Sequence, residues 1–147
     1  MKRTLVCADT SYLFSIYNNN EHSPKALRRL RRLGRPITIS VLNEYELGCA
    51  LRLSEFAGEI GQGRAENYLA QFDADVREGR LELRKVDLDA VFAKAKALAN
   101  KHVMAMGSRS YDMLHVASAL VIGATTFVTF DRVQQKLALA EGLRSPW

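Results

Sequence analysis

The sequence contains little cysteine, proline or glycine: its 147 residues include only 2 Cys, 3 Pro and 9 Gly. Two cysteines, Cys7 and Cys49, cannot form a disulfide framework, so the fold has to rest on apolar burial. We expect each of them to be a small buried hydrophobic residue. The low glycine and proline content excludes a collagen-like chain, and the 48% of hydrophobic residues excludes a disordered one.

Long apolar runs are absent as well. The apolar run near the start is stopped by Asp9, whereas a secretory signal needs roughly 7–15 apolar residues. Residues 116–130 include Ser and Thr and are interrupted by Gly123, so they fall short of the ~20 apolar residues of a membrane span. We therefore expect a soluble, cytoplasmic protein that makes no membrane contact.

The charge balance is mildly basic, with 21 Lys and Arg against 16 Asp and Glu and a formal net charge of +5. This balance favours an anionic partner such as a nucleic acid, although many ordinary soluble proteins carry as much charge. The length suits a single domain, and we expect one over residues 1–147.

Four short, β-prone apolar segments are predicted as strands: residues 4–8, 36–40, 81–86 and 125–129. One or more helices are predicted between successive strands, over residues 12–17, 23–33, 43 onward, 64–77, 87–101, 111–122 and 133–141. Asn43 is predicted to cap the third helix, with Tyr45 turned inward, and Ser108 or Ser110 to cap the sixth. Crossovers of this length indicate a parallel sheet with helices on both faces.

Acidic residues recur where strands end and helices begin. Asp9 closes the first strand and Asp131 follows the fourth, while Glu46 and Asp112 lie in the first turns of two later helices. In a parallel sheet these positions share one edge, so the four acids could converge. Converging carboxylates repel one another unless they are protonated or bridged by a cation. An acidic set without Cys or His ligands suits Mg²⁺ or Mn²⁺, and the matching chemistry is phosphodiester hydrolysis.

A purely structural interpretation of the same acids stays open. Glu46 could complete a capping box with Asn43, and Asp9 could cap the helix that begins near Ser11. Asp112 and Asp131 near helix starts would complement the helix dipole whatever the function. On this interpretation the chain would be a non-catalytic binding module.

Four segments resemble the signature segments of PIN-domain nucleases: residues 6–11, 39–47, 110–119 and 127–132. Their order and spacing and the chain length are most similar to the VapC-like toxins of type II toxin–antitoxin modules, over essentially the whole chain. The resemblance implies a single PIN domain with a three-layer α/β/α fold, in which helices flank a central parallel sheet of four to five short strands.

The resemblance also implies a catalytic metal site for Mg²⁺ (or Mn²⁺) formed by four acids: Asp9, Glu46, Asp112 and Asp131. Glu44 is a rival to Glu46, but the family pattern places its acid six residues after a Ser and just before a Leu, which Glu46 fits. Two residues apart on a helix, the two side chains lie about 200° apart and cannot point the same way. Many relatives carry a further acid beyond the last one, and residues 132–135 offer none.

Other positions receive candidate roles around this site. Thr10, Ser11 and Thr129 match small hydroxyl positions of the family, and Thr10 and Thr129 are candidates to orient metal-bound waters or hydrogen-bond the acids. Arg109 and Arg132 flank two of the acids and are candidates to bind the scissile phosphate.

The histidines receive mostly structural interpretations. His115 lies three residues after Asp112 on the same helix face, where it could relay a proton or act only in packing and hydrogen bonding. His22 and His102 have no apparent partner, and we expect both to face solvent.

The implied function is endoribonuclease activity in the toxin of a toxin–antitoxin pair, with RNA as substrate and with a cognate antitoxin and a second copy of the chain as partners. The antitoxin is expected near Tyr12, Leu13 and the arginine-rich residues 28–35, which could instead contact RNA or simply face solvent. The alternatives are a PIN nuclease outside toxin systems, acting in RNA processing or on DNA, and the non-catalytic module described above.

Overall fold

A four-stranded parallel sheet in the order β3–β2–β1–β4 organises the fold. Each strand is only three residues long: β1 (Val6–Ala8), β2 (Ile37–Ile39), β3 (Leu81–Leu83) and β4 (Thr126–Val128). The central strand β1 pairs with both β2 and β4, and Cys7 lies opposite Thr38 on one side and Phe127 on the other. The four predicted strands and their parallel arrangement are therefore confirmed, with shorter bounds.

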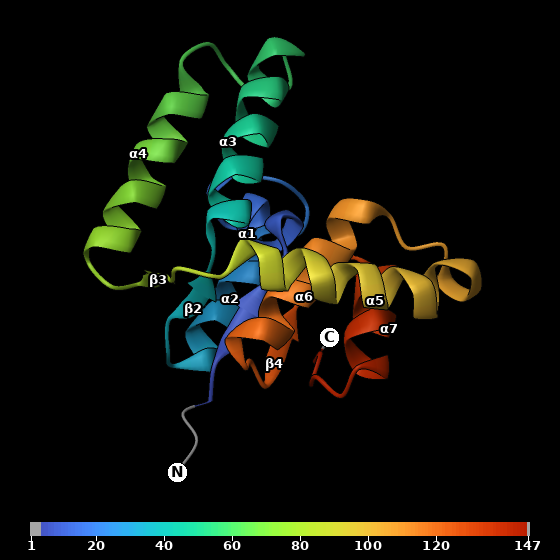
Figure 1. Cartoon of the computed structure of the whole chain (residues 1–147). Helices are drawn as coiled ribbons and strands as arrows, with labels where there is room; N and C mark the ends of the chain where they lie inside the picture. Colours follow the sequence, from blue (N-terminus) through green and yellow to red (C-terminus); the bar gives the residue numbers. More distant parts are fainter. Residues whose placement is uncertain (1–3, 147) are drawn as a thin grey trace.

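Seven helices are present in the computed structural model, which describes residues 4–146: α1 (Thr10–Tyr17), α2 (Ser23–Leu33), α3 (Val41–Phe56), α4 (Arg64–Arg77), α5 (Leu88–Met106), α6 (Ser110–Ile122) and α7 (Arg132–Ala140). Figure 1 shows α5, α6 and α7 gathered on one side of the sheet, and α3 and α4 extending beyond it as a helical hairpin. Over the described residues, no helix combines the length and the apolar character needed to cross a membrane.

The core is divided by the sheet into two apolar clusters, because successive residues of a strand point to opposite faces. Val6, Ala8 and Val128 pack with residues of α1 to α4, whereas Cys7 and Phe127 pack with residues of α5, α6 and α7. The molecule thus has the predicted three layers, with helices covering both faces of the sheet.

The start of α3 differs from the prediction. Ser40 caps this helix, and Asn43 is its capping-box partner: the Asn43 side chain accepts from the Ser40 backbone N–H at 3.1 Å. The prediction that Asn43 caps the helix is therefore wrong, and so is a capping box between Asn43 and Glu46, because the N-cap lies three residues earlier, at Ser40. Tyr45 was expected to point inward, yet it is 64% exposed.

Other local predictions are also corrected. Arg109 occupies the N-cap position of α6 without a side-chain hydrogen bond, so neither Ser108 nor Ser110 caps that helix. His102 does not face solvent, because it is buried and lies 2.8 Å from Glu141 Oε2. Of the two cysteines, Cys7 is buried as expected but Cys49 is exposed. Burial raises the pKa of the Cys7 thiol to about 12, so this thiol stays protonated.

Candidate active site

The site forms where β1 and β4 end side by side. Asp9 follows β1 and caps α1, because its Oδ1 accepts from the Tyr12 backbone N–H at 3.1 Å. Asp131 follows β4 and caps α7, since its Oδ1 accepts from the N–H groups of Val133 and Gln134 at 2.8 and 3.0 Å. The capping expected for Asp9 is confirmed. Both carboxylates are thereby fixed at the carboxyl edge of the sheet, where parallel sheets bind ligands.

Asp9 is the most buried of the four acids, with 1% of its surface exposed. Its second oxygen, Oδ2, accepts three hydrogen bonds: from Ser11 Oγ at 2.5 Å, Thr129 Oγ1 at 2.9 Å and Gln134 Nε2 at 2.9 Å. Burial raises the pKa of Asp9, while the hydrogen bonds from Ser11 and Thr129 act in the opposite direction. Asp9 is a carboxylate whose ionised form needs compensation from its surroundings.

Gln134 links Asp9 to Asp112. Its Nε2 donates to Asp9 Oδ2 at 2.9 Å and to Asp112 Oδ1 at 3.3 Å, so one amide group bridges the carboxylate that follows β1 and the carboxylate in the first turn of α6. Burial and the nearby charge of Asp131 raise the pKa of Asp112. We call Asp9 and Asp112 the inner acids. The neutral amide satisfies their hydrogen bonding without supplying the positive charge that would balance them.

Glu46 is held by a chain of hydrogen bonds that begins at the capping box of α3. The Asn43 amide accepts from Ser40 N–H, donates to Ala8 O at 3.1 Å and directs its NH₂ group at His115 Nδ1, 3.4 Å away. His115 Nδ1 must then be an acceptor, which leaves the proton on Nε2, 3.1 Å from Glu46 Oε2. Although partial burial acts against it, this contact with His115 lowers the pKa of Glu46. The buried His115 therefore orients Glu46.

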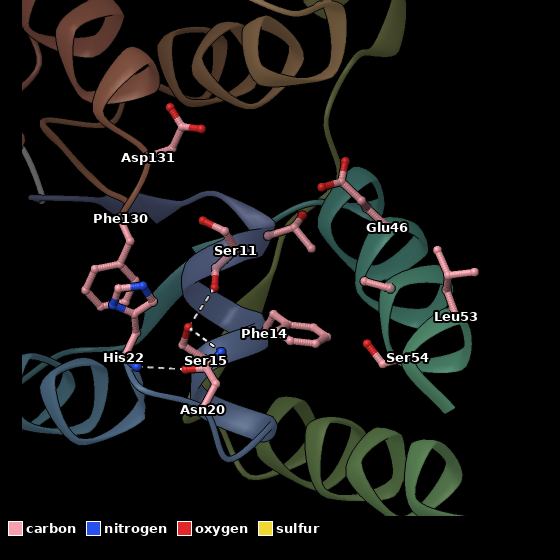
Figure 2. A pocket seen from close by; sticks show the side chains of 12 residues that line it. Ser11, Phe14, Ser15, Asn20, His22, Glu46, Leu53, Ser54, Phe130 and Asp131 are labelled. Atoms are coloured by element: carbon pink, nitrogen blue, oxygen red, sulfur yellow. Dashed lines mark hydrogen bonds between the residues drawn. The ribbon is translucent and has the colours of Figure 1, made fainter. Parts of the chain in front are cut away.

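A cavity of about 580 Å³ opens beside the acids. It is lined by hydroxyl and amide groups of α1 and the following loop, by apolar side chains of α1 and α3, and by Glu46 and Asp131. Figure 2 shows Glu46 and Asp131 on either side of this cavity, projecting from different elements, with Ser11 between them. We call Glu46 and Asp131 the rim acids, since both contact the open cavity whereas Asp9 does not.

The four acids lie at one edge without forming a closed coordination shell. Within residues 4–146, no three side chains of His, Cys, Asp or Glu are arranged closely enough to hold a metal ion as they lie. The donor chemistry nevertheless fits a hard divalent cation, which prefers carboxylate and carbonyl oxygens. In addition, Gln134 Oε1 is a buried acceptor without a hydrogen-bond partner, on the amide that already contacts both inner acids.

The remaining candidates lie around these acids. The Thr129 hydroxyl donates to Asp9, and the Thr10 hydroxyl lies 3.3 Å from His115 Nε2. A hydrogen bond from Thr10 also lowers the pKa of Glu46. Arg109 is exposed, with its Nε 3.8 Å from Asp112 Oδ2. Arg132 is exposed and lines a second cavity next to the first.

The two rival glutamates of α3 are separated as the helix geometry requires. Glu46 approaches the other acids, whereas Glu44 lines a different cavity with Arg52 and Glu66. Gln134 was not anticipated from the sequence. Its sequence position could have indicated it, because Gln134 lies three residues after Asp131 and so falls on the same face of α7.

The sequence matches the model of the PIN domain family over residues 6–139. Sequence comparison with curated proteins gives no match. Among solved structures, the fold resembles VapBC2 from Rickettsia felis bound to a promoter DNA fragment, with 17% identity, a TM-score of 0.66 and coverage of 98% of this chain and 99% of that chain.

Two further structures have the same fold. VapBC-1 from nontypeable Haemophilus influenzae shows 15% identity and a TM-score of 0.67, with 97% of each chain covered. FitAcB from Neisseria gonorrhoeae shows 17% identity and a TM-score of 0.56, with 96% of each chain covered. The family match spans most of the sequence, and the parallel sheet with acids at its carboxyl edge agrees with it. The chain therefore belongs to the PIN domain family.

Proposed function

We propose that this PIN domain is an endoribonuclease that hydrolyses RNA phosphodiester bonds with Mg²⁺ or Mn²⁺. The observation that carries the proposal is the position of the inner acids at the carboxyl edge of the sheet, bridged by Gln134, with the rim acids beside an open cavity. Helix capping explains Asp9 and Asp131 but neither Asp112 nor Glu46, because Arg109 and Ser40 occupy the N-cap positions of their helices. Asp112 still lies in the first turn of α6, where it complements the helix dipole, so the non-catalytic alternative leaves Glu46 without an explanation.

Each acid would have a distinct task in hydrolysis. A bound divalent cation would lower the pKa of a coordinated water and stabilise the negative charge that develops on the phosphate. Asp9 and Asp112 would hold the cation, with Ser11 and Thr129 orienting Asp9 through its Oδ2. Glu46, oriented by His115, and Asp131 would complete the site from the cavity side. Arg109 and Arg132 would bind the scissile phosphate.

We further propose that the chain is the toxin of a type II toxin–antitoxin pair, and that it forms a homodimer. The similar folds come from VapBC and FitAcB structures, and this chain covers 96–99% of each matched chain. An exposed apolar stripe along α3, formed by Val41, Tyr45, Leu53 and Phe56, supports a protein partner at this helix. Tyr12 and Leu13, where the antitoxin was expected, are fully buried and cannot contact a partner in this conformation. Light scattering on a Tyr45→Lys variant tests the dimer, which should dissociate.

The nuclease activity can be tested with the two glutamates of α3. The purified chain with Mn²⁺ should cleave single-stranded RNA, and Glu46→Gln should reduce the cleavage rate about 10- to 100-fold, because the substitution removes one charged ligand. Glu44→Gln carries the same change of charge two residues away and faces another cavity, so it should cleave like the unmodified chain. Equal loss in both variants would contradict the assignment of Glu46.

The alternative functions give different results in the same assay. A PIN nuclease that acts on DNA should cleave a DNA strand of the same sequence at least as well as the RNA. A non-catalytic module should cleave neither strand, and Mn²⁺ should leave its thermal unfolding unchanged. A small antitoxin gene adjacent to the gene for this chain would favour the toxin over a nuclease of RNA processing.

A further inference from the structure

Three aromatic rings stack next to the acidic site. Phe130, directly before Asp131, stacks against Tyr12 with ring centroids 5.4 Å apart and against His22 with centroids 4.8 Å apart. The interplanar angle between Phe130 and His22 is 18°, and Figure 2 shows the two rings overlapping. Tyr12 is fully buried, whereas the His22 side chain is 48% exposed. The stack therefore runs from the core to an imidazole ring that solvent can reach.

The loop before α2 fixes the position of His22. The His22 backbone N–H donates to Asn20 Oδ1 at 2.9 Å, and the Asn20 backbone N–H donates to Ser23 Oγ at 2.9 Å. Ser23 Oγ in turn donates to the Asn18 carbonyl at 2.6 Å. This network fixes the backbone at His22, and the ring itself is held by its stacking on Phe130 and by Glu21, whose Oε1 lies 3.5 Å from His22 Nε2. Because the ring is already held, its ordering would cost a stacking ligand little conformational entropy.

The stacked pair of His22 and Phe130 contacts two cavities at once. On one side is the cavity that contains Glu46 and Asp131. On the other side is a cavity of about 570 Å³, whose lining includes three cationic side chains and no carboxylate: Lys25, Arg132 and Lys136. We call it the cationic cavity. An aromatic platform thus lies between a group of positive charges and the acids.

We propose that the His22–Phe130 pair and the cationic cavity bind a single strand of RNA next to the bond that is cut. A base would stack on His22, the phosphates that follow it along the strand would contact Lys25 and Lys136, and Arg132 would contact the scissile phosphate. The proposal rests on the proposed function, because the substrate is taken to be RNA.

Single strands suit this surface better than duplexes do. Aromatic side chains stack on bases that are free of pairing, whereas the bases of a duplex are already stacked on one another. The cationic cavity has no carboxylate in its lining and adjoins the cavity of the rim acids, so the strand can be held by its backbone while one phosphate is presented to the catalytic edge. Stacking tolerates every base, so the surface would position RNA without reading its sequence.

The experiment measures binding without cleavage. A fluorescent oligouridylate is titrated with the full chain in EDTA, and the Kd is read from anisotropy at several salt concentrations. His22→Ala should raise the Kd about 10-fold, and His22→Phe, which keeps a ring, should stay within about 2-fold of the unmodified chain. Lys25→Gln with Lys136→Gln should reduce the slope of log Kd against log salt by about 1.4. Lys94→Gln with Lys96→Gln, on the exposed side of α5, makes the same change of charge and should have no such effect.

The results separate this inference from the nuclease activity. A chain that binds the oligonucleotide through His22 but cuts no RNA supports the platform and contradicts the nuclease. A chain that cuts RNA while His22→Ala changes neither Kd nor KM overturns the platform and leaves the nuclease. If the chain does not bind the oligonucleotide, or if the α5 pair weakens binding equally, the platform is wrong. The same holds if His22→Ala disrupts only the binding of a protein partner.

Discussion

The inner acids and the rim acids lie at the same edge of the sheet but differ in their hydrogen-bond partners and in their burial. The inner acids, Asp9 and Asp112, share one amide donor, and burial raises the pKa of both. Asp9 also accepts from Tyr12, Ser11 and Thr129. The rim acids do not share a donor: Glu46 contacts the His115 imidazole, and Asp131 accepts from the backbone of α7. The difference is the shared amide of Gln134, which is neutral and therefore brings no positive charge to the inner acids. Under the proposed nuclease function, we expect the cation to bind mainly between the inner acids, whose pKa values burial raises.

The largest expected difference between the two pairs is catalytic. Asp9→Asn should reduce RNA cleavage about 100- to 1000-fold, because under the proposed function this buried carboxylate would contact the cation and solvent could not replace it. Asp131→Asn keeps an N-cap side chain and lies at the cavity, so its loss should be about 10-fold. Initial rates in Mn²⁺ measure both effects, and thermal unfolding by circular dichroism confirms that each variant is folded. A greater loss for Asp131→Asn would reverse the ranking.

The second difference concerns the amide between the inner acids. Gln134→Glu places a third carboxylate against Asp9 and Asp112, which then lose their shared donor. We expect this to cost about 2 kcal/mol in EDTA at neutral pH, or a fall in Tm of about 4–8 °C for a domain of this size. Millimolar Mn²⁺ should raise the Tm of this variant more than that of the unmodified chain.

Gln135→Glu is the matched control for this substitution. Gln135 follows Gln134 on α7, but its amide donates to the Ser145 carbonyl and not to an acid. Gln135→Glu adds the same charge away from the inner acids. The rise in Tm that Mn²⁺ causes in this variant should therefore equal the rise in the unmodified chain. If Mn²⁺ stabilises both variants to the same extent, the inner acids are not where the cation binds.

The smallest expected difference is in the free energy of unfolding. Substituting an inner acid should raise it, whereas substituting a rim acid should lower it. The raised pKa of Asp112 means that the folded chain binds its proton more tightly, so ionising this group costs stability as the pH rises above 3.8. Asp112→Asn should therefore stabilise the metal-free chain at neutral pH, by less than about 1 kcal/mol because solvent screens this partly buried group. The gain should disappear at acidic pH.

Asp131→Ala should have the opposite effect. It removes the cap of α7 and should cost about 1 kcal/mol at neutral pH, most of which Asp131→Asn should restore. Thermal unfolding of the three variants in EDTA, at neutral and acidic pH, measures these changes. A lower Tm for Asp112→Asn at neutral pH would show that its hydrogen bond with Gln134 outweighs the repulsion.

Local pattern was sufficient to predict the sheet and the order of the helices. The strands are short apolar runs between strong helix signals, and parallel pairing follows from the length of the crossovers. The start of α3 was misplaced because Ser40 and Asn43 are both good caps three residues apart, and only the end of β2 shows which of them caps the helix. Tyr45 is exposed because it lies on the outer face of α3, which no other element covers within the described residues.

The parts that could not be predicted depend on distant partners. His102 is buried because Glu141, 39 residues later, accepts its hydrogen bond. Gln134 gains its role because α7 begins beside Asp9, which is 125 residues earlier in the sequence. An amide in a sequence is one neutral polar residue among many, and only the packing of α7 against α6 and β4 gives it two carboxylates to bridge. The acids themselves could be anticipated, because strand ends and helix starts are visible in the pattern.

The capping of two helices by acids of the site couples the backbone to the ligands. Asp9 holds the first turn of α1 and Asp131 that of α7, each through one carboxylate oxygen. A cation that binds either carboxylate would polarise it and weaken the hydrogen bonds that it accepts from backbone N–H groups. The amide protons of Tyr12, Val133 and Gln134 therefore act as built-in reporters, and their rates of exchange with solvent should change when the site is loaded, before any RNA is cut.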